Sequence, residues 1–162
     1  MGHDLSGHAA VVTGGGRGIG WHIAHDLAGA GARVLICGRY ESVLKEASES
    51  IRAAGGDVGF CVCDVAKIDD VARLKETVGR MLGPIAILVN NAGVARSAKF
   101  PDTDEAMWQS ILDINLTGAY RTTRAFWADV VAAGSRGRII NIASVAGEIG
   151  ILYSSAYCAS KH

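Results

Sequence analysis

A cluster of glycines directly after a short apolar run constrains this chain more than any other feature. Residues 9–12 (Ala-Ala-Val-Val) predict a buried strand, the glycines follow at once, and a helical pattern then runs from Ile19 to about Gly29. Glycine lets the backbone turn tightly and approach a ligand closely, and the free N–H groups at the start of the next helix attract anions. This order of strand, glycine turn and helix predicts a site for the pyrophosphate of a dinucleotide. The alternative is a tight turn that binds nothing.

The glycines have the spacing Thr-Gly-x-x-x-Gly-x-Gly, which differs from the G-x-G-x-x-G string of many dinucleotide sites. We expect the residues of this turn to lie against the phosphates of a cofactor. The candidates are Gly14, Gly16, Arg17, Gly18, Ile19 and Gly20.

Strand and helix patterns alternate along the rest of the chain. Strands are expected at 32–37, 58–63, 85–89 and 138–142, and helices at 41–54, 67–82 and 104–133, with a last helix beginning near Tyr157. Thr103 is the expected cap of the long helix. The alternation predicts an α/β fold with a doubly wound parallel sheet. Because no linker, repeat or low-complexity tract interrupts the sequence, residues 1–162 are expected to form one domain.

The charges and the cysteines narrow the class of protein further. Sixteen basic residues match sixteen acidic ones, so a nucleic-acid or membrane partner is not expected, and no apolar run reaches transmembrane length. The four cysteines lie in or beside apolar segments, and Cys61 and Cys63 would share one strand face. Because no further ligands stand near them, we expect no metal site and reduced thiols, as in a cytoplasmic protein.

Two arginines bear on the choice of cofactor. Arg39 follows the second predicted strand, where an acidic residue would bind the ribose 2′-hydroxyl and an arginine would accommodate a 2′-phosphate. No Asp or Glu follows that strand before Glu41, and Arg17 adds a second cation. Together they favour NADP over NAD. The alternative is that both are solvated surface arginines.

Polar and small residues follow the third and fourth predicted strands. Asp64, next to Val65, could accept a hydrogen bond from the adenine amino group, or it could cap the next helix. Small residues after the fourth strand leave room for a flat ring against the backbone, although asparagines there could also brace the strand ends. This second group is Asn90, Asn91, Ala92 and Gly93.

Three residues near the end of the chain are suited to acid–base chemistry. Tyr157 and Lys161 are four apart, so a helix places both on one face, and a cation beside a phenol favours its ionised form. Ser144 follows the fifth strand. Tyr153 has no lysine four residues later, and we expect it to line a pocket or the surface.

Taken together, these motifs resemble the short-chain dehydrogenase/reductase family, in its classical rather than its extended branch. The match comprises Thr13-Gly14-x-x-x-Gly18-Ile19-Gly20, Asp64, Asn90-Asn91-Ala92-Gly93, Asn115, Ser144 and Tyr157-x-x-x-Lys161. The resemblance implies a Rossmann-like fold with strand order 3-2-1-4-5 and later strands. Family members continue well beyond the lysine, so the domain is expected to be incomplete at its C-terminus.

The resemblance also implies a function. It is that of an NADP-dependent oxidoreductase that transfers a hydride between the cofactor and a carbonyl or secondary alcohol, with a 3-oxoacyl thioester as one candidate substrate. Tyr157 would move the proton, Ser144 would orient the carbonyl oxygen, and Lys161 would support the tyrosine and the nicotinamide ribose; Asn115 would hold a water or only brace the long helix. A complete chain is expected to form a homo-oligomer, a dimer or a tetramer. The alternatives are a nucleotide-binding fragment or sensor without turnover, and a purely structural module.

Overall fold

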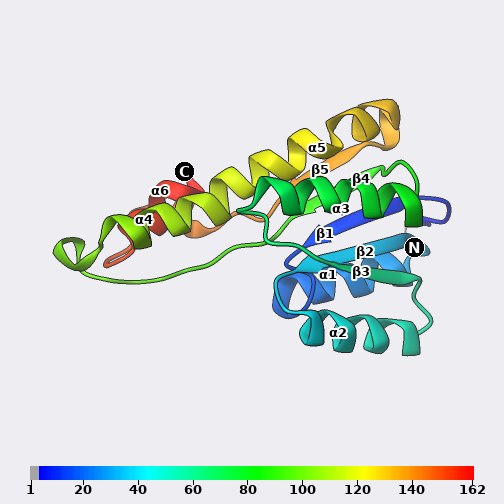
Figure 1. The fold of residues 1–162 in the computed structure, drawn as a ribbon, viewed down its shortest axis with the longest axis horizontal. Coiled ribbons are helices and arrows are strands. Elements are labelled where there is room, and N and C mark those ends of the chain that lie inside the picture. The colour runs from blue at the N-terminus through cyan, green and yellow to red at the C-terminus, as the bar shows by residue number, and fades with distance from the viewer. Residues whose placement is uncertain (1–3) are drawn as a thin grey trace.

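Five short parallel strands form the sheet in a computed structural model that describes residues 4–162 (Figure 1). The strands are β1 (Ala9–Thr13), β2 (Arg33–Gly38), β3 (Val58–Val62), β4 (Ile87–Asn90) and β5 (Arg138–Asn141). Their order is β3-β2-β1-β4-β5, with every pair parallel. The predicted fold class and strand order are therefore confirmed.

Successive residues of a strand point to opposite faces, and the central strands are apolar on both. Val11 of β1 packs under α3 (Ile68–Met81) and α5 (Gly118–Ala132), whereas Val12 packs under α1 (Gly18–Gly29) and α2 (Glu41–Ala53). Figure 1 shows these two helix pairs on opposite faces of the sheet. Burial on both faces explains why these strands are continuously apolar.

The sheet holds a core of fully buried large side chains on each face. Leu35, Leu74 and Phe126 are completely buried on one face, as is Ile36 on the other. Each such side chain contributes about 1.5–3 kcal/mol when it is removed from water. This rigid core holds the carboxyl ends of the strands, where the polar candidate residues lie.

The long helix expected at 104–133 is two helices joined by a π-helical turn. α4 (Glu105–Leu112) leads through the π turn (Asp113–Thr117) into α5. The cap is Asp104, whose carboxylate accepts a hydrogen bond from the Met107 N–H at 2.7 Å. The prediction that Thr103 caps the helix was wrong, because its hydroxyl donates to the Lys99 carbonyl instead.

Short 3-10 turns punctuate the loops at Phe100–Asp102, Gly134–Arg136 and Val145–Gly147. β4 begins two residues later than expected, and the Ile85 N–H donates to the Asp129 carboxylate at 3.3 Å rather than to a neighbouring strand.

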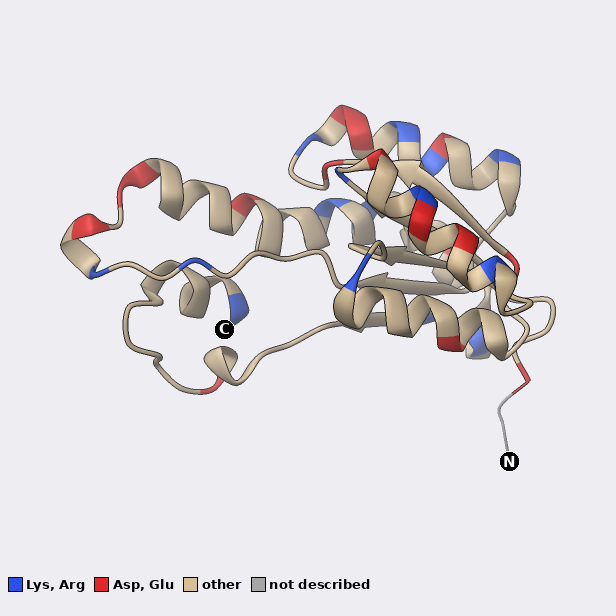
Figure 2. Ribbon diagram, turned by 90° about the horizontal axis from the view of Figure 1, so that it is seen from below, with Lys and Arg blue, Asp and Glu red and all other residues tan. Residues whose placement is uncertain are grey.

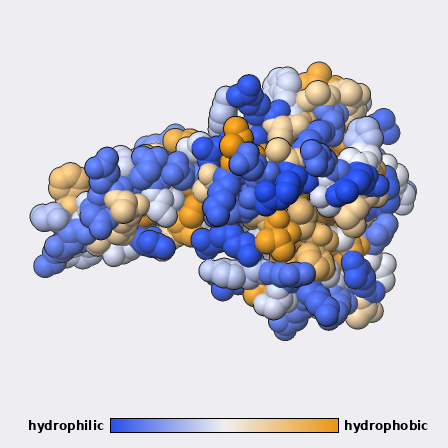
Figure 3. All heavy atoms as spheres, viewed as in Figure 1, coloured by the Kyte–Doolittle hydropathy of each residue, from blue (hydrophilic) through white to orange (hydrophobic). Residues whose placement is uncertain are grey.

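α4 and the last helix, α6 (Ser155–Lys161), project beyond the sheet as an arm (Figures 1 and 3). Basic and acidic residues are interspersed along the helices over the sheet (Figure 2). None of the described helices has both the length and the apolar character needed to cross a membrane.

Candidate functional site

The carboxyl ends of β1 to β4 open into a cleft of about 360 Å³. Parallel strands end at one edge of the sheet, so the loops that follow them meet there, and ligands of open α/β sheets bind at this edge. Most of the residues predicted to contact a cofactor line this cleft. They are Gly14, Gly16, Arg17, Gly18, Ile19, Gly20, Arg39, Asp64, Val65, Asn91, Ala92 and Gly93.

The glycine turn needs its glycines for conformation and for space. Gly14 and Gly18 have φ of +66° and +56°, a region that favours glycine. A Cβ on Gly20 would lie 2.4 Å from the Gly14 carbonyl oxygen. α1 therefore packs directly on the turn.

The first turn of α1 is open to an anion. It contains no acidic residue, and its N-cap, Arg17, makes no side-chain capping hydrogen bond. The N–H groups at the start of a helix have no partner within the helix and carry its positive dipole end. Because this turn lines the cleft, those donors are available to a phosphate.

Thr13 locks the turn to the neighbouring strand. Its hydroxyl accepts hydrogen bonds from the N–H groups of Asn91 and Ala92, at 3.0 and 2.9 Å, and donates to the Val89 carbonyl. The Asn91 amide donates in return to the carbonyls of Thr13 and Gly14. The sequence predicts Thr13 only as part of the family motif; a threonine at the end of a buried strand is the sequence signal for this bracing role.

Two guanidinium groups stand at the rim of the cleft. Arg17 and Arg39 are both exposed, and the Arg39 guanidinium lies 5.5 Å from the centre of the Tyr40 ring. Among residues 4–162, neither arginine forms an ion pair. The rim therefore carries two cations that can bind a phosphate in the bidentate manner of arginine.

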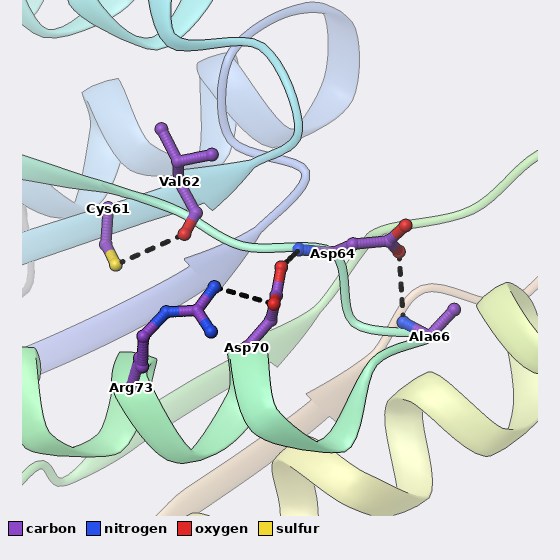
Figure 4. Close-up of polar contacts among 6 residues, drawn as sticks. All are labelled: Cys61, Val62, Asp64, Ala66, Asp70 and Arg73. Carbon is purple, nitrogen blue, oxygen red and sulfur yellow. Dashed lines mark hydrogen bonds and ion pairs between the residues drawn. The ribbon is translucent and has the colours of Figure 1, made fainter.

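Asp64 lies in the turn after β3 and does not cap the next helix. Its carboxylate accepts a hydrogen bond from the Ala66 N–H at 3.1 Å, while the N-cap of α3 is Lys67. Asp70, in the first turn of α3, accepts a hydrogen bond from the Asp64 N–H (Figure 4). That bond, and then the Arg73 guanidinium, lower the pKa of Asp70 below its ordinary value.

Asn90 is buried away from the cleft lining, in contrast to its neighbour Asn91. Its amide nitrogen donates to Thr123 and Asn141, and its amide oxygen accepts from the Thr122 hydroxyl at 2.7 Å. Asn90 thus braces β4 against β5 and α5, which was the alternative interpretation of these asparagines.

Two cysteines lie at the base of the cleft. Cys37 and Cys63 are both buried, and a hydrogen bond with Cys63 together with burial raises the pKa of the Cys37 thiol well above its ordinary value. Burial also raises the pKa of Cys61. All four cysteines are free, and no three His, Cys, Asp or Glu side chains of the described chain come together as metal ligands.

Asn115 connects the cleft wall to the last helix. It lies in the π turn, where its side chain bonds both the N–H and the carbonyl of Val94, at 2.8 and 2.9 Å. The same amide donates to the Ser160 hydroxyl of α6 at 2.9 Å. Val94 lines the cleft, so α6 is tied to one end of it.

Ser144 and Lys161 lie where β5 ends against α6. The Lys161 ammonium donates to the Ile142 carbonyl at 2.8 Å, and a Cβ on Gly147 would lie 2.3 Å from the Lys161 carbonyl oxygen. Ser144 precedes Gly147 in this loop, and its hydroxyl accepts from the Ala146 N–H. Tyr157 stands one turn before Lys161, half-buried. The four predicted catalytic residues thus lie on or beside α6, and none of them is among the residues that line the cleft; their role as one catalytic group stays a prediction.

Tyr153 lies apart from this group. It is 57% exposed, has φ of +61°, and borders a second cavity together with Phe100 and Leu152. Its expected position at a pocket or the surface is confirmed.

Several cleft residues were not predicted. Tyr40 and Val43 follow Arg39, and Val94 and Ile114 adjoin Gly93 and Asn115. The sequence offers no motif for these residues; they are simply the neighbours of residues that were predicted to contact the cofactor or the substrate.

This sheet order, glycine turn and cleft define a dinucleotide-binding α/β fold. The sequence model described as "short chain dehydrogenase" matches residues 8–162. The chain therefore belongs to the short-chain dehydrogenase family, as its motifs indicate.

Two of the similar sequences are named as an acetoacetyl-CoA reductase and a ketoacyl reductase. The chain is 38% identical over 154 residues to the acetoacetyl-CoA reductase of Allochromatium vinosum, covering 94% of this chain and 62% of that protein. It is 37% identical over 157 residues to the ketoacyl reductase HetN of a Nostoc species, covering 97% and 54%. The chain thus spans about half to two thirds of the length of the curated relatives that it matches.

Solved structures agree with the fold over the whole chain. A crystal structure of a variant actinorhodin polyketide ketoreductase with NADPH has a TM-score of 0.92 and 35% identity, covering 100% of this chain and 62% of the other. A metagenomic short-chain oxidoreductase in complex with NADP has a TM-score of 0.91 and 40% identity, covering 97% and 71%.

Proposed function

We propose that this chain carries the cofactor site and the catalytic group of an NADP-dependent oxidoreductase that interconverts a carbonyl and a secondary alcohol. The observation that carries the proposal is the cleft, which has an anion-accepting glycine turn and two exposed arginines at its rim. Its far wall is tied through Asn115 to the helix of Tyr157 and Lys161.

The cleft residues fit an NADP molecule. The open helix start and the glycines suit the pyrophosphate, Arg39 suits a 2′-phosphate, and Asp64 suits the adenine amino group. Asn90 is the exception among the expected contacts, because its polar atoms are already bonded within the protein. We therefore assign Asn90 a bracing role.

The chemistry divides between cofactor and protein. When bound, the nicotinamide supplies or accepts the hydride. In the reducing direction Tyr157 donates a proton to the carbonyl oxygen as negative charge develops there, and Ser144 donates a hydrogen bond to the same oxygen. Lys161, one turn beyond Tyr157 on α6, is assigned the role of holding the nicotinamide ribose.

Asn115 has two proposed contributions. Its side chain holds Val94 and Ser160 in place, so it fixes α6 relative to the cleft. The water-binding role predicted from the family resemblance stays a prediction.

The substrate class follows from the relatives. Two of them are named as reductases of ketoacyl and acetoacetyl groups, and a structural neighbour as a polyketide ketoreductase. We propose a 3-oxoacyl thioester as the first substrate to test. We also propose that the protein is cytoplasmic.

A homo-oligomer is the proposed assembly. Four large apolar residues lie exposed on the π turn and α5, at spacings of four, seven and four that keep them on one side of a helix. They are Leu116, Tyr120, Trp127 and Val131. Such a stripe is suited to packing against a second copy of the chain.

The proposal is tested by titrating the protein with NADPH and NADH and then adding a panel of ketones and 3-oxoacyl thioesters. Tighter binding of NADPH and its oxidation by a panel member are expected. Tight binding without oxidation of NADPH by any carbonyl would favour the nucleotide-binding fragment or sensor instead.

A further inference from the structure

The turn between β3 and α3 is held by a carboxylate from the helix that follows it. The Asp70 carboxylate accepts a hydrogen bond from the Asp64 N–H at 2.9 Å with one oxygen, and its other oxygen lies 2.6 Å from the Arg73 guanidinium. Asp70 is the third residue of α3, so it reaches back beyond the helix start. Figure 4 shows Asp70 between Arg73 and the Asp64 backbone.

Asp70 holds the backbone of Asp64, from which the Asp64 side chain extends. In Figure 4 its carboxylate points away from Asp70, and one oxygen accepts from the Ala66 N–H. Within the described chain, its second oxygen accepts no hydrogen bond. Because Asp64 lines the cleft, this oxygen is available to a donor on a ligand.

The charges around Asp64 are consistent with this role. Asp70 is hydrogen-bonded to the Asp64 backbone, so its negative charge acts on the Asp64 carboxylate unless a cation balances it. The Arg73 guanidinium pairs with Asp70, and the pKa of Asp70 is lowered, so Asp70 stays ionised as an acceptor. Asp64 is thereby spared an uncompensated neighbouring charge.

The rest of the turn is held from the opposite side. Arg121 of α5 donates to the Ala66 carbonyl, and Val65 packs against Gly118, where a Cβ would lie 2.6 Å from the valine side chain. α5 therefore holds Val65 and Ala66, and Asp70 holds Asp64. Loss of the Asp70 acceptor would loosen the Asp64 backbone, which then keeps only its bonds to Lys67 and Ala66, while the contacts of Val65 and Ala66 with α5 stay intact.

We propose that Asp70 is a positioning residue that aims the Asp64 carboxylate at the exocyclic amino group of adenine, and so sets the preference for adenine over hypoxanthine in the cofactor. This rests on the proposed function. Adenine presents an amino donor at this position, and hypoxanthine presents a carbonyl acceptor that a carboxylate repels. A well-aimed carboxylate therefore discriminates strongly between the two bases, whereas a mobile one does so weakly.

The experiment measures the dissociation constants of NADPH and of its analogue with hypoxanthine in place of adenine. The wild type is expected to prefer NADPH by about tenfold or more, as for a hydrogen bond to a charged group. Asp70→Ala is expected to reduce this preference at least about threefold, mainly through weaker NADPH binding. Asp70→Asn keeps an acceptor oxygen and is expected to retain most of the preference.

Asp69→Ala is the matched control, because Asp69 lies exposed in the same helical turn and its replacement removes the same negative charge. It should leave the preference unchanged. Equal preference in Asp70→Ala and the wild type would overturn the inference, and so would a uniform loss of affinity for both ligands, since that is the result of a merely structural role. A wild type that binds neither dinucleotide would overturn the proposed function itself, and this inference with it.

Discussion

Replacement of Gly20 by alanine should separate helix α1 from the glycine turn. The added Cβ would lie 2.4 Å from both the Gly14 carbonyl oxygen and the Asn91 amide nitrogen. Non-bonded heavy atoms ordinarily stay about 3.5 Å apart or more. The helix and the turn must therefore move apart by about 1 Å. The Asn91 amide would then lose its hydrogen bonds to the Thr13 and Gly14 carbonyls.

The cost of Gly20→Ala can be worked from these contacts. Overpacking costs about 1–3 kcal/mol, and each lost hydrogen bond adds about 0.5–1.5 kcal/mol. The better helix propensity of alanine returns about 1 kcal/mol. With two hydrogen bonds lost, the middle of each range gives a net loss of about 3 kcal/mol, which would lower Tm by about 6–12 °C in a chain of this size. Displaced N–H donors should also weaken NADPH binding by about tenfold or more.

Thermal unfolding and NADPH titration of Gly20→Ala test this reasoning, with Gly79→Ala as the control. Gly79 lies within α3, and a Cβ there would meet nothing within 4 Å. The control is therefore expected to gain about 0.4–1 kcal/mol of stability. If Gly20→Ala were as stable as the control and bound NADPH as tightly as the wild type, the tight packing of α1 on the turn would be refuted.

Three further predictions follow from single contacts. Arg39→Asp should lower the ratio of NADH to NADPH dissociation constants by about tenfold or more, because it removes a charge-assisted bond to the 2′-phosphate; an unchanged ratio in fluorescence titrations would exclude this role. Thr13→Val leaves the Asn91 and Ala92 N–H groups without their acceptor and should cost about 1–3 kcal/mol for each in urea unfolding; a change below about 0.5 kcal/mol would contradict the locking role. The pKa of Asp70 is lowered by the Asp64 N–H, Arg73 and Lys67, so its charge stabilises the fold fully above the unfolded pKa of about 3.9 and this stabilisation is lost as the pH falls through the lower folded pKa. The stability difference between wild type and Asp70→Asn should therefore be constant from about pH 5 to 8 and shrink below about pH 4; a difference that persists at still lower pH would show that the charge is not responsible.

The features that were predicted correctly from the sequence depend on local pattern. Continuous apolar strands and the glycines between strand and helix identify the sheet and the cleft, because burial on both faces and tight turns leave a direct compositional signal. The strand order came from the family resemblance, since pattern alone does not order parallel strands.

The features that were missed depend on choices between neighbouring residues. Thr103 and Asp104 can both cap a helix, and the backbone path selects Asp104. Asn90 ends β4 and Asn91 follows it; because successive side chains alternate, Asn90 turns toward α5 and Asn91 toward the glycine turn. The contact between Asp70 and the Asp64 backbone spans six residues and forms only once β3 and α3 are packed.

The most direct test of the central claim is the rate of NADPH oxidation by a 3-oxoacyl thioester, compared between Tyr157→Phe and Tyr153→Phe. Both variants lose one phenol hydroxyl, but only Tyr157 stands one turn before Lys161, and Tyr153 borders the second cavity. Tyr157→Phe is expected to lose turnover by about a hundredfold or more while it still binds NADPH, and Tyr153→Phe is expected to stay close to the wild type. Full turnover in Tyr157→Phe, or loss of turnover in Tyr153→Phe alone, would contradict the proposed catalytic group.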